Sequence, residues 1–239
     1  YIYSEQILRH NAEVLKKTFI DRGFKVSYAM KANSNPTILN LFRNYGLGLD
    51  IVSEGEFKMA KYCGFEGSEI NFAGVGKTVE ELDLALAFDI DHFNVESRFE
   101  LELLEKRAGI AGKKAVVLLR LNPDIDPLTH PHISTGLKQN KFGMSPEKVR
   151  YFLTHPESFP HIQFDGIHCH IGSQILQPQP FYDLIDYLQK FTKSLRGEGV
   201  KFNNLDLGGG FGVNYEDPLE DISTTTPFLE SIAERAIEK

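Results

Sequence analysis

The sequence predicts an α/β fold, specifically most of a (β/α)8 TIM-type barrel, and three observations support this prediction. Seven short apolar segments are each followed by an amphipathic helical segment, which implies parallel strands joined by right-handed crossovers. Polar and apolar side chains alternate within most of these strands. No change in composition marks a linker, so we treat residues 1–239 as one domain. An open doubly wound sheet is the alternative, but we interpret the chain as a barrel that lacks its eighth strand.

The elements follow one another in a regular order. The predicted strands cover residues 24–30, 47–52, 70–73, 91–95, 115–122, 163–171 and 202–207. The predicted helix starts carry capping residues or a first-turn proline, namely Ser4, Asn35-Pro36, Ser53 with Glu56, Thr78 with Glu81, Ser97 with Glu100, Ser145-Pro146 and Thr226-Pro227. The connection 123–144 is longer than most loops in compact domains, which is typical of a functional or disordered segment.

The alternation within the strands predicts where polar groups gather. Asp50, for example, lies between Leu49 and Ile51, and the apolar pair must face the surrounding helices. The opposite face then carries a polar set, consisting of Lys31, Asp50, Asn94, Arg120, His168, His170 and Asp206. Buried charges must be paired or must bind a polar ligand, so we expect this set to form the functional site.

Composition excludes several classes of function. A net charge of −7 argues against a nucleic-acid partner or an anionic membrane surface. The chain has only two cysteines, no apolar run long enough to span a membrane, and no signal peptide at its start. We therefore expect a cytoplasmic enzyme, and because the first residue is not methionine, we interpret the chain as part of a longer protein.

Two stretches are candidates for the chemistry. Lys31 follows an apolar strand and has small neighbours, Ala29 and Ala32; a solvated surface lysine is the alternative interpretation. A lysine amine in a partly desolvated site has a lowered pKa and becomes a nucleophile. The glycine run 208–210 follows the seventh strand, where barrels commonly bind phosphate, although a plain flexible turn would also contain glycines.

The sixth strand ends in a second candidate segment, which contains His168, His170 and Ser173. Two histidines at a spacing of two could bind zinc together with Asp206, as in a metal hydrolase, but no further ligand pattern follows. One histidine is more simply a hydrogen-bonded core residue, and the other could place its ring against a flat cofactor. Ser173 could add a donor to the same phosphate.

Taken together, these motifs resemble the barrel domain of the fold-type III pyridoxal-phosphate enzymes, and within them the diaminopimelate decarboxylase branch. The stretches that carry the resemblance span nearly the whole chain. They are Tyr-Ala-Met-Lys-Ala-Asn at 28–33, Asp-Ile-Val-Ser-Glu-Gly-Glu at 50–56, Arg-Leu-Asn-Pro-Asp-Ile-Asp at 120–126, His-Pro-His-Ile-Ser-Thr-Gly at 130–136, Lys-Phe-Gly at 141–143, His-Ile-Gly-Ser-Gln at 170–174 and Leu-Asp-Leu-Gly-Gly-Gly at 205–210.

The resemblance implies a role for each of these site residues. Lys31 would bind pyridoxal 5'-phosphate (PLP) as a Schiff base, and His170 would stack on its ring. The phosphate would be bound by Ser173 and by the amides of the glycine run, Gly208, Gly209 and Gly210. Asp50 and Glu56 would lie near the lysine, and Arg120 would balance their charge, although Glu56 could equally serve as the capping partner of Ser53. We interpret His168 and Cys169 as structural, and we expect no metal.

The resemblance also implies an activity, namely decarboxylation of meso-2,6-diaminopimelate to L-lysine in lysine biosynthesis, by a homodimer. An ornithine or arginine decarboxylase of the same fold, or a non-catalytic PLP-binding homologue, is the alternative. Family members continue beyond the glycine run with an eighth strand and a C-terminal β domain. We therefore expect the alanine-racemase-like barrel in residues 1–239 to be incomplete, and inactive and poorly stable by itself, since an unclosed sheet leaves an exposed edge.

Overall fold

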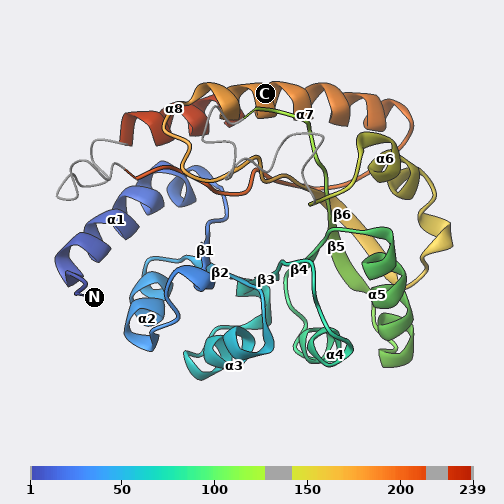
Figure 1. The fold of residues 1–239 in the computed structure, drawn as a ribbon, viewed down its shortest axis with the longest axis horizontal. Helices are drawn as coiled ribbons and strands as arrows, with labels where there is room; N and C mark the ends of the chain where they lie inside the picture. The colour runs from blue at the N-terminus through green and yellow to red at the C-terminus, as the bar shows by residue number, and fades with distance from the viewer. Residues whose placement is uncertain (1, 127–141, 214–225, 238–239) are drawn as a thin grey trace.

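The computed structural model describes residues 2–126, 142–213 and 226–237, and it contains one parallel sheet whose seven strands are paired in chain order. The strands curve around a common centre, with the helices outside them (Figure 1). The strand bounds are β1 Ser27–Ala29, β2 Gly48–Ile51, β3 Ile70–Phe72, β4 His92–Val95, β5 Ala115–Arg120, β6 Ile162–His168 and β7 Asn204–Asp206.

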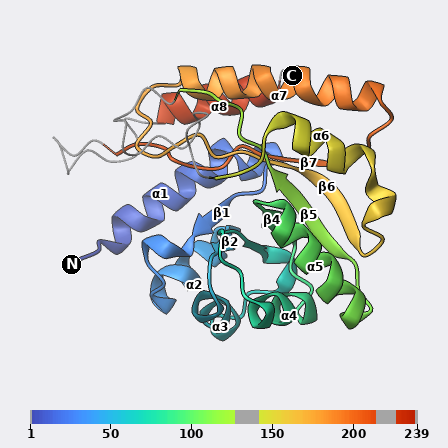
Figure 2. The same cartoon turned by 45° about the vertical axis from the view of Figure 1, so that its right-hand side comes forward.

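Each strand is followed by a helix that packs on the outside of the sheet (Figures 1 and 2). The α-helices are α1 Glu5–Thr18, α2 Pro36–Asn44, α3 Glu54–Tyr62, α4 Val79–Ala87, α5 Arg98–Ala111, α6 Pro146–Thr154, α7 Gln179–Gly197 and α8 Thr226–Ile237. Short 3-10 turns lie at Ile20–Arg22, Met30–Ala32, Gly67–Glu69 and Pro156–Ser158. The predicted fold class, seven βα units of a parallel barrel, is therefore confirmed.

All seven predicted strands are present, but six of them end one to three residues earlier than predicted, and in two of these the difference changes the position of a candidate site residue. β1 stops at Ala29, and the chain turns through the 3-10 segment Met30–Ala32, in which Met30 is buried. Lys31 therefore lies on a turn above the strand and does not continue its alternation. β6 stops at His168, so His170 lies in the following loop.

Side-chain caps are present, with one difference in geometry, at six of the predicted helix starts, namely Ser4, Asn35, Ser53, Thr78, Ser97 and Ser145. The hydroxyls of Ser53, Thr78 and Ser97 each accept a hydrogen bond from the amide three residues later. Of these three caps, the one at Thr78 is the reciprocal capping box with Glu81 that the sequence predicted. In the other two, the carboxylate reaches one residue further back.

Glu56 accepts from the amide of Val52 at 2.7 Å, and Glu100 accepts from that of Glu96 at 2.9 Å. These carboxylates therefore fasten each helix start to the end of the strand before it.

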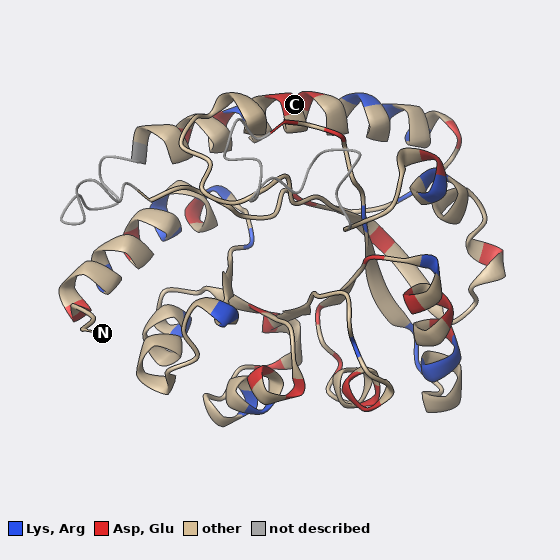
Figure 3. Cartoon of the chain, in the orientation of Figure 1, with Lys and Arg blue, Asp and Glu red and all other residues tan. Residues whose placement is uncertain are grey.

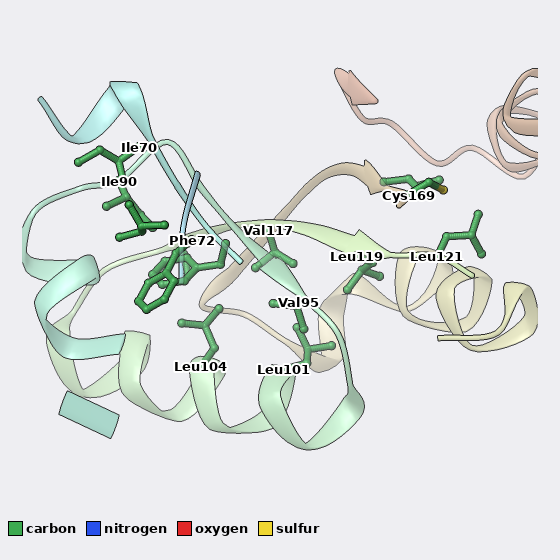
Figure 4. Close-up of a cluster of buried hydrophobic side chains, with 14 of the residues drawn as sticks. Ile70, Phe72, Ile90, Val95, Leu101, Leu104, Val117, Leu119, Leu121 and Cys169 are labelled. Atoms are coloured by element: carbon green, nitrogen blue, oxygen red, sulfur yellow. The ribbon is translucent and has the colours of Figure 1, made fainter. Parts of the chain in front are cut away.

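Apolar side chains on the outer face of the sheet form the main core with the helices. Figure 4 shows side chains of β3, β4 and β5 packed against Leu101 and Leu104 of α5. Leu49, Ile51 and Val95 are fully buried, as the alternation predicted. Leu205 is an exception, because it is 44% exposed on β7, which is the last strand of the sheet in the described part of the chain.

Contacts between aromatic rings and between helices connect the β1 edge and the β7 edge of the sheet. The ring of Phe211, after β7, stacks on Phe19, before β1, with centroids 6.5 Å apart, and on Phe181 of α7 at 4.9 Å. Helix α8 packs between α7 and α1 (Figure 1). The outer layer therefore approaches closure although the sheet itself has unpaired edges at β1 and β7 among the described residues.

Charged residues of both signs are interspersed along the outer helices (Figure 3). Within the described ranges, we find no helix with the length and hydropathy needed to cross a membrane.

Candidate functional site

Polar side chains from neighbouring strands meet on the inner face of the sheet, near the carboxyl ends of the strands. Arg120 of β5, His168 of β6 and Asp206 of β7 are direct register partners. His168 Nε2 lies 3.9 Å from Asp206 Oδ2. Asp50 of β2 lies on the same inner face, because its neighbours Leu49 and Ile51 are buried in the outer core and side chains alternate along a strand. The predicted polar face thus forms a single cluster.

Several buried polar atoms in this cluster have no hydrogen-bond partner among the described residues. They are Asp50 Oδ1, His92 Nε2, Asn94 Oδ1, Glu96 Oε2 and His168 Nδ1. Buried polar atoms in folded proteins are nearly always paired, because leaving one unpaired costs about 1–3 kcal/mol. An interior with so many unpaired atoms is suited to a polar ligand and ordered water, and not to a purely structural core.

Burial dominates the electrostatics of the cluster. It raises the pKa of Asp50 to about 7, with a further increase from the neighbouring Asp206 charge and an opposing decrease from Lys31. Burial lowers the pKa of His168 to about 4 and that of His170 to about 3, and the positive charge of Arg120 lowers both further. Both imidazoles are therefore neutral at pH 7.

Lys31 lies at the rim of this cluster. Its side chain is exposed, and within the described ranges it has no hydrogen bond or ion pair. Its charge nevertheless affects the pKa of both Asp50 and His170, so the amine lies within electrostatic range of the site. The turn that carries it is held by the Tyr28 hydroxyl, which donates to the Asn33 carbonyl at 3.2 Å.

The glycine run lies directly against the segment that follows β6. Gly208 and Gly210 have φ angles of +70° and +100°, and a Cβ on them would lie 2.4 Å from the Cys169 carbonyl and 1.9 Å from the Gly172 carbonyl, respectively. Only glycine fits at these two positions. A Cβ on Gly209, by contrast, would have no neighbour within 4 Å.

The loops after β6 and β7 are joined by hydrogen bonds. The amide of Ile175 donates to the Gly210 carbonyl at 2.9 Å, and Gln174 Oε1 accepts from the Val213 amide at 3.0 Å. Gln174 has a φ of +59°, which is uncommon for a residue other than glycine. This pairing holds exposed Ser173 beside Gly210.

In the described part of the chain, the amides of Gly209 and Gly210 have no acceptor. Together with the nearby Ser173 hydroxyl they are donors available to an anion, and we call these three groups the candidate anion cradle. The amide of Gly208, which the sequence also assigned to phosphate binding, instead donates to Asp206 Oδ1 at 2.7 Å. The Gly208 amide is therefore already hydrogen-bonded to the Asp206 carboxylate. The role of Gly208 is to let the two loops approach each other closely.

Arg120 has a different partner from the one expected. Its Nη1 donates to Glu96 Oε1 at 2.8 Å, not to Asp50 or Glu56. The carboxylate of Glu56 is used at the start of α3, so its capping role is observed, while a site role for it stays a prediction. Glu96 was not among the predicted site residues, although it follows β4 at the same parity as inward-facing Asn94.

The remaining predictions are located as follows. Cys169 is fully buried in the apolar cluster of Figure 4, and burial strongly raises the pKa of its thiol. The motif stretches 130–136 and Lys141 lie outside the described residues. Among the residues that are described, no group of three histidine, cysteine, aspartate or glutamate side chains could hold a metal ion.

The fold and the candidate site define a class of protein: a parallel α/β barrel domain with polar side chains and a candidate anion cradle at the carboxyl ends of its strands. Comparison with known families is more specific. Residues 5–238 match the family described as pyridoxal-dependent decarboxylase, pyridoxal binding domain, and the chain belongs to this family. The predicted pyridoxal cofactor is thereby confirmed at the level of the family.

Known proteins of this family are similar over nearly the whole chain. Diaminopimelate decarboxylase of Vibrio cholerae is 44% identical over 92% of the chain, and that of Haemophilus influenzae is 40% identical over all of it. The crystal structure of diaminopimelate decarboxylase from Helicobacter pylori complexed with L-lysine superposes with a TM-score of 0.90, at 36% identity over 99% of the chain. The chain spans about half the length of these relatives, 52–58%.

Proposed function

We propose that the full-length protein containing this chain catalyses the PLP-dependent decarboxylation of meso-2,6-diaminopimelate to L-lysine and carbon dioxide. The single observation that carries the proposal is the 40% identity to a diaminopimelate decarboxylase over the entire chain. The polar barrel interior, the accessible lysine and the candidate anion cradle supply the donors and the reactive amine that such a cofactor needs.

The residues of this chain fit the cofactor at its two ends. The Nζ atom of Lys31 would hold the aldehyde end covalently, since its amine is accessible and has no partner among the described residues. The amides of Gly209 and Gly210 and the hydroxyl of Ser173 would hold the phosphate. The neutral ring of His170 would lie against the pyridine ring without adding charge. When bound, the cofactor supplies the electron sink for the carbanion left by loss of carbon dioxide.

Asp50 is suited to proton exchange near Lys31. With a pKa of about 7, its carboxyl is populated in both protonation states at neutral pH, so it can accept a proton from an amine or return one. The barrel interior orients this group by burying it beside Asp206. Arg120, held against Glu96, would contribute a fixed positive charge to the cofactor site.

We further infer the setting of the whole protein. Residues 1–239 would be the pyridoxal-binding, alanine-racemase-like barrel domain of a longer cytoplasmic enzyme that forms a homodimer and acts on a small amino acid. Taken alone, this segment would be inactive, since the chain is about half as long as its relatives. Decarboxylation of diaminopimelate by the isolated segment would contradict that expectation.

A two-part experiment tests the proposal. The full-length protein is assayed for carbon dioxide release from meso-diaminopimelate, ornithine and arginine, and we expect release from the first alone. The protein is then reduced with borohydride and digested, and mass spectrometry should find a pyridoxyl adduct on Lys31. Preference for ornithine or arginine would replace the substrate but keep the cofactor site. An adduct without any carbon dioxide release would favour a non-catalytic homologue, and no adduct at Lys31 would refute the assignment of the site.

A further inference from the structure

A buried ion pair lies next to the carboxyl ends of β3 and β4. The Lys77 side chain is only 1% exposed, and its ammonium donates to Glu100 Oε1 at 2.6 Å. It also donates to the carbonyls of Gly74 and Asn94, each at 2.8 Å. All three donors of the amine are therefore used, and the turn after β3 is tied to the end of β4.

The same ion pair fixes the backbone of Glu96. The second oxygen of Glu100 accepts from the Glu96 amide at 2.9 Å, and Ser97 caps the helix that carries Glu100. Glu96 is thus held by a residue whose own carboxylate is locked by Lys77. Such a chain of buried, charge-assisted hydrogen bonds restricts motion more than an exposed pair would.

Glu96 in turn restricts the side chain of Arg120. Its side chain is 3% exposed, and Oε1 accepts from Arg120 Nη1 at 2.8 Å. The guanidinium of Arg120 also lies 5.5 Å from the ring centroid of Phe142, and this ring restricts the motion of the guanidinium on a second side. Arg120 is the register partner of His168, so this chain of contacts ends inside the polar cluster.

From these contacts we propose that Glu96 is a positioning residue that acts on the cofactor site through Arg120, with the Lys77–Glu100 pair as its buried support. The inference rests on the proposed function and names a residue that the sequence analysis did not consider. Arginine has many rotamers and a fork of five donors. Without a fixed partner it would lose its orientation toward the site, and its charge would be unbalanced. Glu96 Oε2, which has no partner in the described part of the chain, leaves room for one more donor at this position.

The test is a double-mutant cycle in the full-length protein, with the dissociation constant of PLP as the main readout. Glu96→Gln keeps the shape of the side chain but removes its charge, and we expect PLP affinity to fall on the order of tenfold, the effect of losing one charge-assisted hydrogen bond. Arg120→Gln should have a larger effect. The double variant should bind PLP no more weakly than Arg120→Gln alone, because Glu96 acts through Arg120.

Two further variants provide controls. Glu102→Gln removes a carboxylate that pairs with Arg98 on the exposed side of α5 and should leave PLP affinity unchanged. Glu96→Asp keeps the charge, and we expect it to restore affinity to within about threefold, so the test survives if Glu96→Gln fails to fold.

Wild-type affinity in Glu96→Gln, or losses that simply add in the double variant, would overturn the positioning role. Failure of the proposed function would be distinguishable, because the unaltered protein would then bind no PLP or release no carbon dioxide.

Discussion

Two lysines at the same rim of the barrel differ in almost every physical respect. Lys31 follows β1, is exposed and has no hydrogen bond or ion pair among the described residues. Lys77 follows β3, is 1% exposed and donates to three acceptors. An amine that is buried and donates to three acceptors is held in place and closed to other molecules, whereas an accessible amine without a partner is open to a ligand. The comparison shows that the set of partners, and not the place after a strand, separates a buried structural lysine from one that is accessible to a ligand.

The largest effect is expected for Lys31→Ala. In the full-length protein this change should abolish both decarboxylation and the borohydride-trapped pyridoxyl adduct, because the covalent attachment is lost. The free energy of unfolding of the apoprotein should change by less than about 0.5 kcal/mol, since the side chain is exposed and unpaired. Activity assays and urea denaturation measure the two quantities. Marked destabilisation would mean that Lys31 has structural contacts after all.

Lys77→Met, in contrast to Lys31→Ala, should strongly reduce the free energy of unfolding. The change leaves Glu100 buried without its cation, and we expect a loss of about 3–5 kcal/mol in the free energy of unfolding. The control is Lys58→Met, which removes an exposed ion pair with Glu54 on α3 and should cost less than about 1 kcal/mol. Urea denaturation of both variants makes the comparison, and equal effects would contradict the structural role of the buried pair.

The glycine run permits a smaller and more local comparison. Gly210→Ala should destabilise the protein by roughly 2 kcal/mol or more, because φ is +100° and the new Cβ would collide with the Gly172 carbonyl. Gly209→Ala has open space and should change stability by less than about 1 kcal/mol. Its methyl group would nevertheless enter the candidate anion cradle and weaken PLP binding. Thermal unfolding and PLP titration separate the two effects. Unchanged PLP affinity in Gly209→Ala would show that the Gly209 amide does not bind the phosphate.

A further effect concerns pH. The pKa of Asp50 is raised in the folded state from 3.8 to about 7, so the folded protein binds more protons than the unfolded chain between these values. The stability that Asp50 contributes is therefore present below about pH 4 and is lost as the pH rises through 7, at up to about 1.4 kcal/mol per pH unit.

Asp50→Asn should remove this loss and become more stable than the wild type near pH 8, while the two proteins converge toward pH 4. His168 and His170, whose pKa values are lowered, act in the opposite direction as the pH falls below about 6.5 in both proteins. Urea denaturation across this pH range is the measurement, and a constant difference would show that Asp50 is ionised throughout.

Local patterns predicted much of this fold because they arise from short-range physics. Hydroxyl caps such as Ser53 and Thr78 could be predicted from the sequence, because the donor and the acceptor are only three residues apart. The burial of Leu49 and Val95 followed from strand alternation. Leu205 broke the same rule, because its exposure depends on what lies beyond β7, and alternation within one strand carries no information about its neighbours.

The candidate site was predictable in its membership and less so in its pairing. Strand alternation alone was enough to place Asp50, Arg120 and Asp206 on the inner face of the sheet. The partner of Arg120 was not, because Glu96 lies 24 residues away in the chain and meets Arg120 only when β4 and β5 pair in the observed register. The amide of Gly208 was likewise assigned to an anion, whereas a neighbouring carboxylate accepts its hydrogen bond.

The sequence by itself determined the order of strands and helices, the polar face of the sheet and the residue types at its rim, since periodicity and capping act within a few residues. The tertiary structure decided which charges neutralise one another, which polar atoms are left unpaired, and which of two rim lysines is accessible. These properties depend on desolvation and on distances between strands far apart in the chain, and both arise only when the sheet curves and buries its interior.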